Sequence, residues 1–259
     1  MNELKRERDV KCELFNDHFQ NYKRYAIPKA QLVIADIPYN LGNNAYASSN
    51  TWYVDGKIEN GESDKAGKSF FDTDENFKIA EFMHFCSTLL IKEPKETGKA
   101  PCMIVFCAFQ QMQMVIEYAQ KYGFKNYIPL VFIKKTSGQV LKANMKIVGA
   151  TEYGLVLYRD KLPKFNNNGR MVLNWFEWEI DNSYPKIHPT QKPIPLLKRL
   201  IEIFTDYGDV VIDPVAGSAS TLRAAFEINR TAYGFEIKKD FYKLAKEKML
   251  SEVPMTLKL

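Results

Sequence analysis

Hydrophobic residues occur along the chain in two alternating kinds of segment, short apolar runs and longer amphipathic stretches. The short runs are rich in Val, Ile, Leu and Phe and are bounded by turn residues, which is typical of buried strands. The predicted strands are Gln31–Asp36, Ala100–Phe109, Tyr127–Lys134, Glu152–Arg159, Asp209–Asp213 and Thr231–Ile237. The predicted helices are Asn76–Ile91, Gln110–Tyr122, Pro193–Thr205, Ser218–Asn229 and Lys238–Ser251.

The order of these elements predicts the fold class. Strands that alternate with helices are typical of an α/β protein, with a mostly parallel, doubly wound sheet and helices on both faces. No helix is predicted between Tyr127–Lys134 and Glu152–Arg159, so these two strands are expected to pair antiparallel. We therefore expect one domain over residues 1–259.

Two stretches interrupt the alternation. Asn43–Asp74 is rich in Gly, Ser, Asn and Asp, and a long irregular loop of this kind is usually functional or disordered. Residues 136–184 are predicted to form a small inserted region. Its aromatic residues Trp175, Phe176 and Trp178 would, on the simplest interpretation, anchor the insertion to the core.

Composition and charge narrow the class of protein. Hydrophobic residues make up 46% and charged residues 26%, as in ordinary globular proteins. There is no apolar run of membrane-spanning length, and the charged start Met1–Lys11 is unlike a signal peptide, so a cytoplasmic protein is expected. The four cysteines form no CxxC pair and no zinc pattern, so free thiols and no metal are expected.

The net charge of +5 is unevenly distributed. Between Lys134 and Arg170 the chain has eight basic and two acidic residues, a net charge of +6 in this segment alone. A local basic patch of this kind suits a phosphate backbone. The alternative is a solvated loop.

The first candidate site is Asp36-Ile-Pro-Tyr39, at the carboxyl end of a predicted strand. Ligands bind at this end of the strands in open α/β sheets. Asp36 and the Ile37 carbonyl can accept hydrogen bonds from a planar amine, and the Tyr39 ring can stack on its plane. Pro38 fixes one backbone angle and removes a competing donor. The alternative is an ordinary strand exit with a solvated Asp.

The second candidate site is the turn Asp213–Ala219, between a strand and a predicted helix. Ser218 is a good helix N-cap, the helix start can receive a carboxylate, and Gly217 lets a ligand approach the backbone. Glu236 ends the next strand, where an acid can bind ribose hydroxyls. GxGxxG is absent, so a nucleoside with an amino-acid tail, S-adenosylmethionine, suits this turn better than a dinucleotide.

Three stretches resemble motifs of the amino-methyltransferases that act on DNA. Asp213-Pro-Val-Ala-Gly-Ser-Ala219 resembles their cofactor motif DPFxGSG, and Asp36-Ile-Pro-Tyr39 resembles their catalytic motif DPPY. His188-Pro-Thr-Gln-Lys-Pro193 looks like the stretch that precedes the cofactor motif. The catalytic motif comes first and the cofactor motif late, which is the order of the β group. Ile37, Val215 and Ala219 depart from the family pattern and bear mainly on how tightly the cofactor binds.

The resemblance implies methyl transfer from S-adenosylmethionine to the exocyclic amine of a flipped base. The catalytic residues would be Asp36, Ile37, Pro38 and Tyr39. The cofactor-binding residues would be Asp213, Val215, Ala216, Gly217, Ser218, Ala219 and Glu236, with Thr190, Gln191 and Lys192 closing over its amino-acid end. The leading Asp favours adenine N6 over cytosine N4, because Ser is commoner in the cytosine enzymes.

Residues 136–184 are then predicted to be the target-recognition region for double-stranded DNA. Lys and Arg hold phosphates, and Asn reads adenine edges in the major groove. The candidate DNA-binding residues are Lys134, Lys135, Lys142, Lys146, Asn166, Asn167, Asn168 and Arg170. The alternatives are a cytosine-N4 enzyme, a methyltransferase acting on RNA or glutamine, and a non-catalytic DNA-binding relative. A homodimer also stays open.

Overall fold

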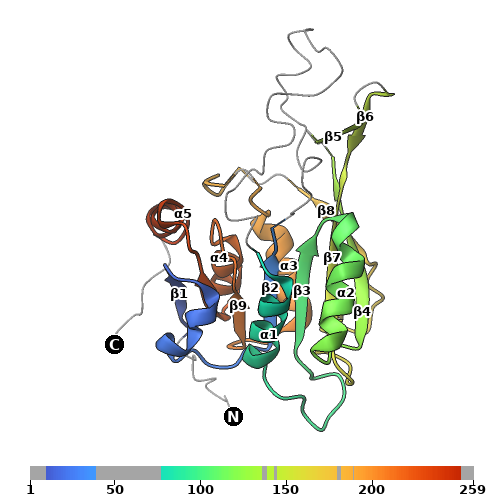
Figure 1. Cartoon of the computed structure of the whole chain (residues 1–259), viewed down its shortest axis with the longest axis vertical. Helices are drawn as coiled ribbons and strands as arrows, with labels where there is room; N and C mark the ends of the chain where they lie inside the picture. The colour runs from blue at the N-terminus through green and yellow to red at the C-terminus, as the bar shows by residue number, and fades with distance from the viewer. Residues whose placement is uncertain are drawn as a thin grey trace, which may run out of the picture.

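The computed structural model describes residues 10–38, 77–135, 139–142, 145–179, 182–188 and 190–251. These residues form an eight-stranded sheet in the order β1-β10-β9-β2-β3-β7-β4-β8 (Figure 1). Neighbouring strands are parallel except at β7, which runs antiparallel to both β3 and β4. The predicted α/β class with a mostly parallel sheet is therefore confirmed.

The six predicted strands all lie in this sheet, with ends within two residues of those expected. They are β2 (Leu32–Asp36), β3 (Cys102–Cys107), β4 (Asn126–Lys134), β7 (Thr151–Tyr158), β9 (Val210–Asp213) and β10 (Thr231–Phe235). The expected antiparallel pair is β4 with β7. The sequence did not predict the two edge strands, β1 (Cys12–Phe15) and β8 (Trp175–Trp178). Both are short, and polar residues interrupt their apolar ones.

The five predicted helices are also present, and each is shorter than expected. They are α1 (Ile79–Leu89), α2 (Met112–Lys121), α3 (Ile194–Phe204), α4 (Ser220–Glu227) and α5 (Lys239–Leu244), and α5 continues into the π-helical turn η6 (Ala245–Met249). The short 3-10 helices are η1 (Phe19–Tyr25) and η4 (Phe109–Gln111). Ser218 is not the N-cap of α4 as predicted. The left-handed backbone at Gly217 and Ala219 delays the helix, so Ala219 is the N-cap.

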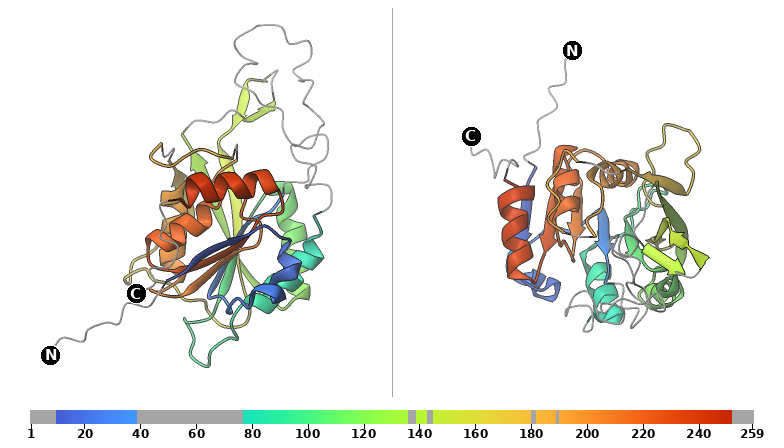
Figure 2. Two further views of the ribbon diagram at one scale, coloured as in Figure 1. Left: turned by 90° about the vertical axis from the view of Figure 1, so that its left-hand side faces the viewer. Right: turned by 90° about the horizontal axis from the view of Figure 1, so that it is seen from above.

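Alternate side chains of the strands enter two cores, one on each face of the sheet. On β2, Leu32 and Ile34 pack with α3 and α4, while Val33 and Ala35 pack with α1 and α2. Figure 2 shows α3 and α4 (orange) and α1 (teal) on opposite sides of the sheet. Because strand side chains alternate between faces, near-continuous apolar runs such as β2 and β3 are what this two-sided burial requires.

Residues 136–184 do not form one inserted lobe. The hairpin of β5 (Gln139–Lys142) and β6 (Ile147–Gly149) extends beyond the top of the sheet in Figure 1, but β7 and β8 belong to the sheet itself. Tyr39 and the predicted loop Asn43–Asp74 lie outside the described residues. Within the described parts of the chain, no helix is long and apolar enough to cross a membrane.

The chain leaves β2 and β9 in opposite directions. These strands are neighbours in the sheet, but α1 after β2 lies on one face and α4 after β9 lies on the other. In open α/β sheets, a divergence of this kind forms a crevice at the carboxyl ends of the strands, and ligands bind there. Both sequence motifs begin at this position, because β2 ends at Asp36 and β9 ends at Asp213.

Candidate active site

The turn that follows Asp36 is held by the neighbouring strand β3 and by η4. The Ile37 amide donates to the Phe106 carbonyl at 3.2 Å, and the Ile37 side chain is buried in the core. The Gln111 side-chain amide donates to the Pro38 carbonyl at 3.0 Å and accepts from the Ala108 amide at 3.0 Å. This buried glutamine was not predicted. It fixes the backbone on which Asp36 and the Ile37 carbonyl would face a substrate.

The turn Asp213–Ala219 is closed by two buried carboxylates. Asp213 Oδ1 accepts from the Val215 amide at 3.0 Å. Glu236 accepts from the Gly217 amide at 2.9 Å and from the Lys238 amide at 2.7 Å. A carboxylate has about four lone-pair sites, so these two bonds leave Glu236 capacity for ribose hydroxyls.

Burial sets the protonation of these two acids. It raises the pKa of Asp213 to about 7, against the hydrogen bonds from Thr221 and the Val215 amide. Burial also raises the pKa of Glu236, although hydrogen bonds from the backbone amides of Lys238, Gly217 and Ile237 lower it. Asp213 therefore titrates near neutral pH while it holds the turn.

Ala219 is one of the three departures from the family pattern, and its effect on cofactor binding stays a prediction. The structure places it in the hydrophobic core, fully buried, with φ of 60°. Left-handed backbone is strained for a residue with a Cβ, which explains why a glycine suits this position in the family motif.

The stretch before α3 lies against the same turn. His188 packs on Phe241 with ring centroids 4.6 Å apart, and a Cβ added at Gly217 would lie 3.9 Å from the His188 ring. Burial lowers the pKa of His188 to about 4, helped by the charges of Lys192 and Lys238, so the ring is neutral at pH 7. His188, the first residue of the motif, therefore lies beside Gly217 of the Asp213 turn.

Thr190 and Gln191 make polar contacts within their own loop. The Thr190 amide donates to His188 Nδ1 at 3.3 Å. The Gln191 side chain accepts from the Ile187 amide at 3.2 Å and donates to the Pro185 carbonyl at 3.1 Å. Their predicted contact with the cofactor's amino-acid end stays a prediction.

The predicted contact of Lys192 with the cofactor also stays a prediction. In the structure its side chain is 7% exposed, and its ammonium lies 2.5 Å from Asp36 Oδ2 and 3.3 Å from Glu152 Oε2. Glu152 also pairs with Lys134. The sequence did not identify Glu152, because its place at this edge depends on the reversed direction of β7.

The predicted DNA-binding lysines lie on both sides of this cluster. Lys134 forms an ion pair with Glu152, and its ammonium lies 4.5 Å from the centroid of the Trp178 ring. Lys135 is exposed and forms ion pairs with Glu177 and Glu179. The hairpin carries the other two predicted lysines, Lys142 on β5 and the exposed Lys146 at its turn.

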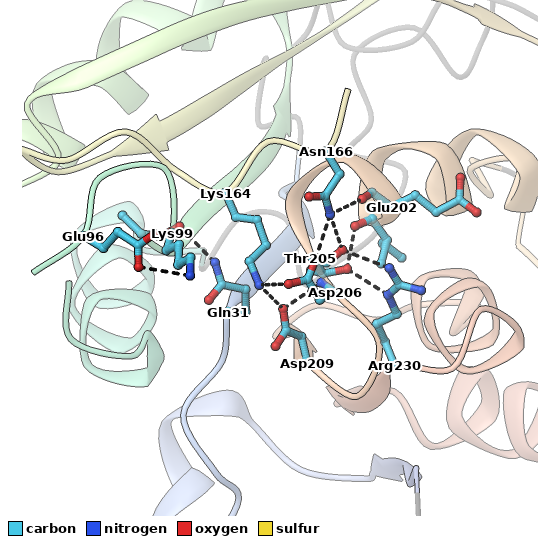
Figure 3. A network of polar contacts seen from close by, with 12 residues as sticks. Gln31, Glu96, Lys99, Lys164, Asn166, Glu202, Thr205, Asp206, Asp209 and Arg230 are labelled. Atoms are coloured by element: carbon cyan, nitrogen blue, oxygen red, sulfur yellow. Dashed lines mark hydrogen bonds and ion pairs between the residues drawn. The ribbon is translucent and has the colours of Figure 1, made fainter. Parts of the chain in front are cut away.

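The asparagines have structural roles that the sequence did not predict. The Asn166 side chain donates to the carbonyls of Glu202 and Thr205 and to Asp206 Oδ1, at the end of α3 (Figure 3). This is the opposite edge of the sheet from Asp36, so Asn166 is not placed to read bases there.

The two asparagines that follow belong to a turn of their own. Asn167 accepts from the Gly169 amide and donates to the Arg170 carbonyl, and Asn168 has left-handed backbone with φ of 51°. Arg170 itself is exposed. Their predicted contacts with DNA, base reading by Asn167 and Asn168 and phosphate binding by Arg170, stay predictions.

A mostly parallel sheet with these acids at the carboxyl ends of β2, β9 and β10 places the protein in the class of S-adenosylmethionine-dependent methyltransferases. The DNA methylase model N6_N4_Mtase matches residues 30–247, and the chain belongs to this family of DNA methyltransferases. It is 39% identical over 239 residues to type II methyltransferase M.HpaI of Haemophilus parainfluenzae, covering 85% of this chain and 68% of the relative. It is 27% identical over 258 residues to DNA adenine methyltransferase YhdJ of Escherichia coli (strain K12), covering 91% and 81%.

Solved structures share the fold. The M1.HpyAVI–SAM complex superposes with a TM-score of 0.63 at 20% identity, covering 91% of this chain and 98% of that one. PvuII DNA methyltransferase (cytosine-N4-specific) superposes with a TM-score of 0.60 at 13% identity, covering 93% and 88%.

Proposed function

We propose that this DNA methyltransferase methylates adenine at N6 within a specific sequence of double-stranded DNA. The observation that carries the proposal is the position of Asp36 and the Ile37 carbonyl, at the end of β2 beside the Asp213 turn of β9. The similarity to an adenine methyltransferase over 91% of the chain supports adenine as the base.

The residues of the crevice suit a transfer between a bound sulfonium and a flipped base. A base inside the duplex is out of reach, so it must be extruded into the site. Its exocyclic nitrogen is a weak nucleophile because its lone pair is delocalised into the ring. Hydrogen bonds from that amine to Asp36 and to the Ile37 carbonyl would draw the nitrogen toward tetrahedral geometry and aim the lone pair at the methyl group. Asp36 would then stabilise the positive charge that develops on nitrogen.

The cofactor would be held by the Asp213 turn on the other side of the crevice. S-adenosylmethionine supplies the electrophilic methyl group. The Glu236 carboxylate would accept hydrogen bonds from its ribose hydroxyls, and the backbone at Gly217 would lie under its amino-acid part. The proton on the methylated amine leaves after transfer.

The β5–β6 hairpin is our proposal for the part that reads DNA. It extends past the edge of the sheet that carries Asp36 (Figure 1), and Lys142 and Lys146 lie on it. Lys135 follows β4 directly at the same edge. Phosphate contacts of this kind position the duplex over the crevice.

The test is methylation of unmodified DNA by the purified chain with S-adenosylmethionine, followed by nucleoside mass spectrometry and methylation-aware sequencing. We expect N6-methyladenine at one sequence. N4-methylcytosine would instead assign the chain to the cytosine branch, and absence of any methylated base would contradict the proposal.

Asp36→Ala is the variant that tests the catalytic assignment. Losing this charged acceptor should lower the transfer rate by at least about 100-fold, roughly 3 kcal/mol, with cofactor affinity nearly unchanged. Asp209→Asn, at the opposite edge of the sheet, is the matched control and should keep the wild-type rate. Near-normal turnover of Asp36→Ala would refute the role of this carboxylate.

A further inference from the structure

Four side chains of alternating charge lie in a row along the carboxyl edge of the sheet. Lys192, just before α3, contacts Asp36 of β2 and Glu152 of β7, and Glu152 contacts Lys134 of β4. The side chains of Lys192, Glu152 and Lys134 are 7%, 15% and 21% exposed, and that of Asp36 is 29% exposed. The row thus runs from Lys134 through the more buried Glu152 and Lys192 to the Asp36 carboxylate at the end of β2.

The surroundings keep the ammonium of Lys192 in one place. It lies 5.2 Å from the centroid of the Phe106 ring and 5.3 Å from that of the Trp178 ring, with a carboxylate on each side. Burial lowers the pKa of Lys192, but the charges of Asp36 and Glu152 outweigh burial and leave the pKa above its usual value. Burial likewise raises the pKa of Glu152, yet Lys192 and Lys134 hold it below its usual value. Both groups are therefore charged at neutral pH.

Stability alone does not account for this arrangement. Taking charges out of water costs free energy that a buried ion pair barely recovers, and apolar side chains of the same size often serve a fold equally well. The row ends on Asp36, whose carboxylate is proposed to accept a hydrogen bond from the exocyclic amine of the base. An ion pair at Oδ2 restricts rotation of the carboxylate and so fixes the direction in which Oδ1 points.

We propose that Lys192 and Glu152 are positioning residues of the methyl-transfer reaction, which orient the Asp36 carboxylate toward the exocyclic amine of the base. The inference rests on the role proposed above for Asp36. Glu152 holds Lys192 from the far side, so the ammonium is fixed by two carboxylates and does not follow Asp36 when the latter binds the base. Lys134 contacts the other oxygen of the Glu152 carboxylate, Oε1.

Single-turnover transfer with Glu152→Gln tests the inference. Misplacement of a reacting group by about 1 Å costs about 100-fold in rate, so we expect the rate constant to fall between about 10-fold and 100-fold. The dissociation constants for S-adenosylmethionine and DNA should stay near the wild-type values. The amplitude of the turnover should also be unchanged, because it counts folded enzyme, and a purely structural defect would lower the amplitude instead of the rate constant.

Lys192→Met and the double variant complete the test. Met retains the apolar contact with Phe106 and Trp178 but removes the charge, and it should lower the rate constant to a similar extent. Because both residues act through one carboxylate, the double variant should be no slower than the slower single variant. Glu152→Asp keeps the negative charge but shortens the side chain, so the carboxylate is drawn away from Lys192. This variant should also be slower than wild type, although its net charge is unchanged.

The matched control is Asp209→Asn, which breaks the partly buried pair with Lys164 at the opposite edge. It should lower stability without changing the rate constant. A wild-type rate constant in Glu152→Gln and Glu152→Asp, with an active wild-type enzyme, would overturn this inference alone. A wild-type chain that transfers no methyl group to DNA would overturn the proposed function and this inference with it.

Discussion

Asp213 is a carboxyl group buried at the end of a strand, and its proton is linked to folding. Its usual pKa is 3.8, and burial raises this to about 7 in the folded chain. Between about pH 4 and pH 7 the folded chain therefore binds more protons at this site than the unfolded chain, so this group makes stability fall as the pH rises through that window.

Asp213→Asn should remove this dependence while keeping an acceptor for the Val215 amide. We expect the variant to gain stability over wild type at pH 8.5, and the gain to shrink at pH 5.5. Urea denaturation at both values, without cofactor, measures the difference. Asp209→Asn controls for loss of a carboxylate elsewhere, and an equal difference between Asp213→Asn and wild type at the two pH values would contradict the assignment.

Glu236 is the residue on which cofactor affinity should depend most directly. Glu236→Ala removes the proposed ribose acceptor and the acceptor of the Gly217 amide, so S-adenosylmethionine should bind at least about 10-fold more weakly. DNA affinity should be nearly unchanged. Calorimetric titration of the wild type and of Glu236→Ala with the cofactor measures this difference. Equal dissociation constants would place the ribose site elsewhere.

At the scale of elements, α3 is clamped at its carboxyl end. Lys164 pairs with Asp206 at 2.6 Å and with Asp209 at 3.1 Å, and Arg230 Nη2 donates to the Thr205 carbonyl at 2.9 Å (Figure 3). The Asn166 amide completes the clamp. The last carbonyls of a helix have no partner within the helix, and these side chains supply one.

Asn166→Ala should therefore lower the free energy of unfolding by about 1 kcal/mol, without changing the transfer rate of the folded enzyme. Asn167→Ala is the matched control, because its side chain bonds only within its own turn. A loss of DNA specificity in Asn166→Ala with unchanged stability would restore the original assignment to base reading.

The hairpin is the element whose charge should govern DNA affinity. Lys142→Gln with Lys146→Gln should weaken binding to all sequences and reduce the salt dependence of the affinity by up to about 2 in logarithmic slope. Binding curves at several salt concentrations measure this. An unchanged slope would leave the hairpin outside the DNA contact.

At the scale of the molecule, the sequence predicted what depends on local pattern. Asp36 and Asp213 could be found because each follows an apolar run and precedes turn residues, which places both at the carboxyl edge of a parallel sheet. The contact of Lys192 with Asp36 joins residues 156 positions apart, and no periodicity encodes it. Gln111 and Glu152 were missed for the same reason, since their roles depend on which strands become neighbours.

The β5–β6 hairpin leaves and re-enters the sheet at adjacent positions. Ile133 of β4 pairs with Thr151 of β7, so the two ends of the insertion are separated by a single strand spacing, about 4.8 Å. The closure entropy of a loop grows only slowly with its length. Insertions of very different size can therefore be exchanged at this junction at little cost to the fold. The junction itself is constrained, since Lys134 and Glu152 flank it. If the hairpin reads DNA as proposed, the target sequence can change between related chains while the residues of the transfer site stay the same.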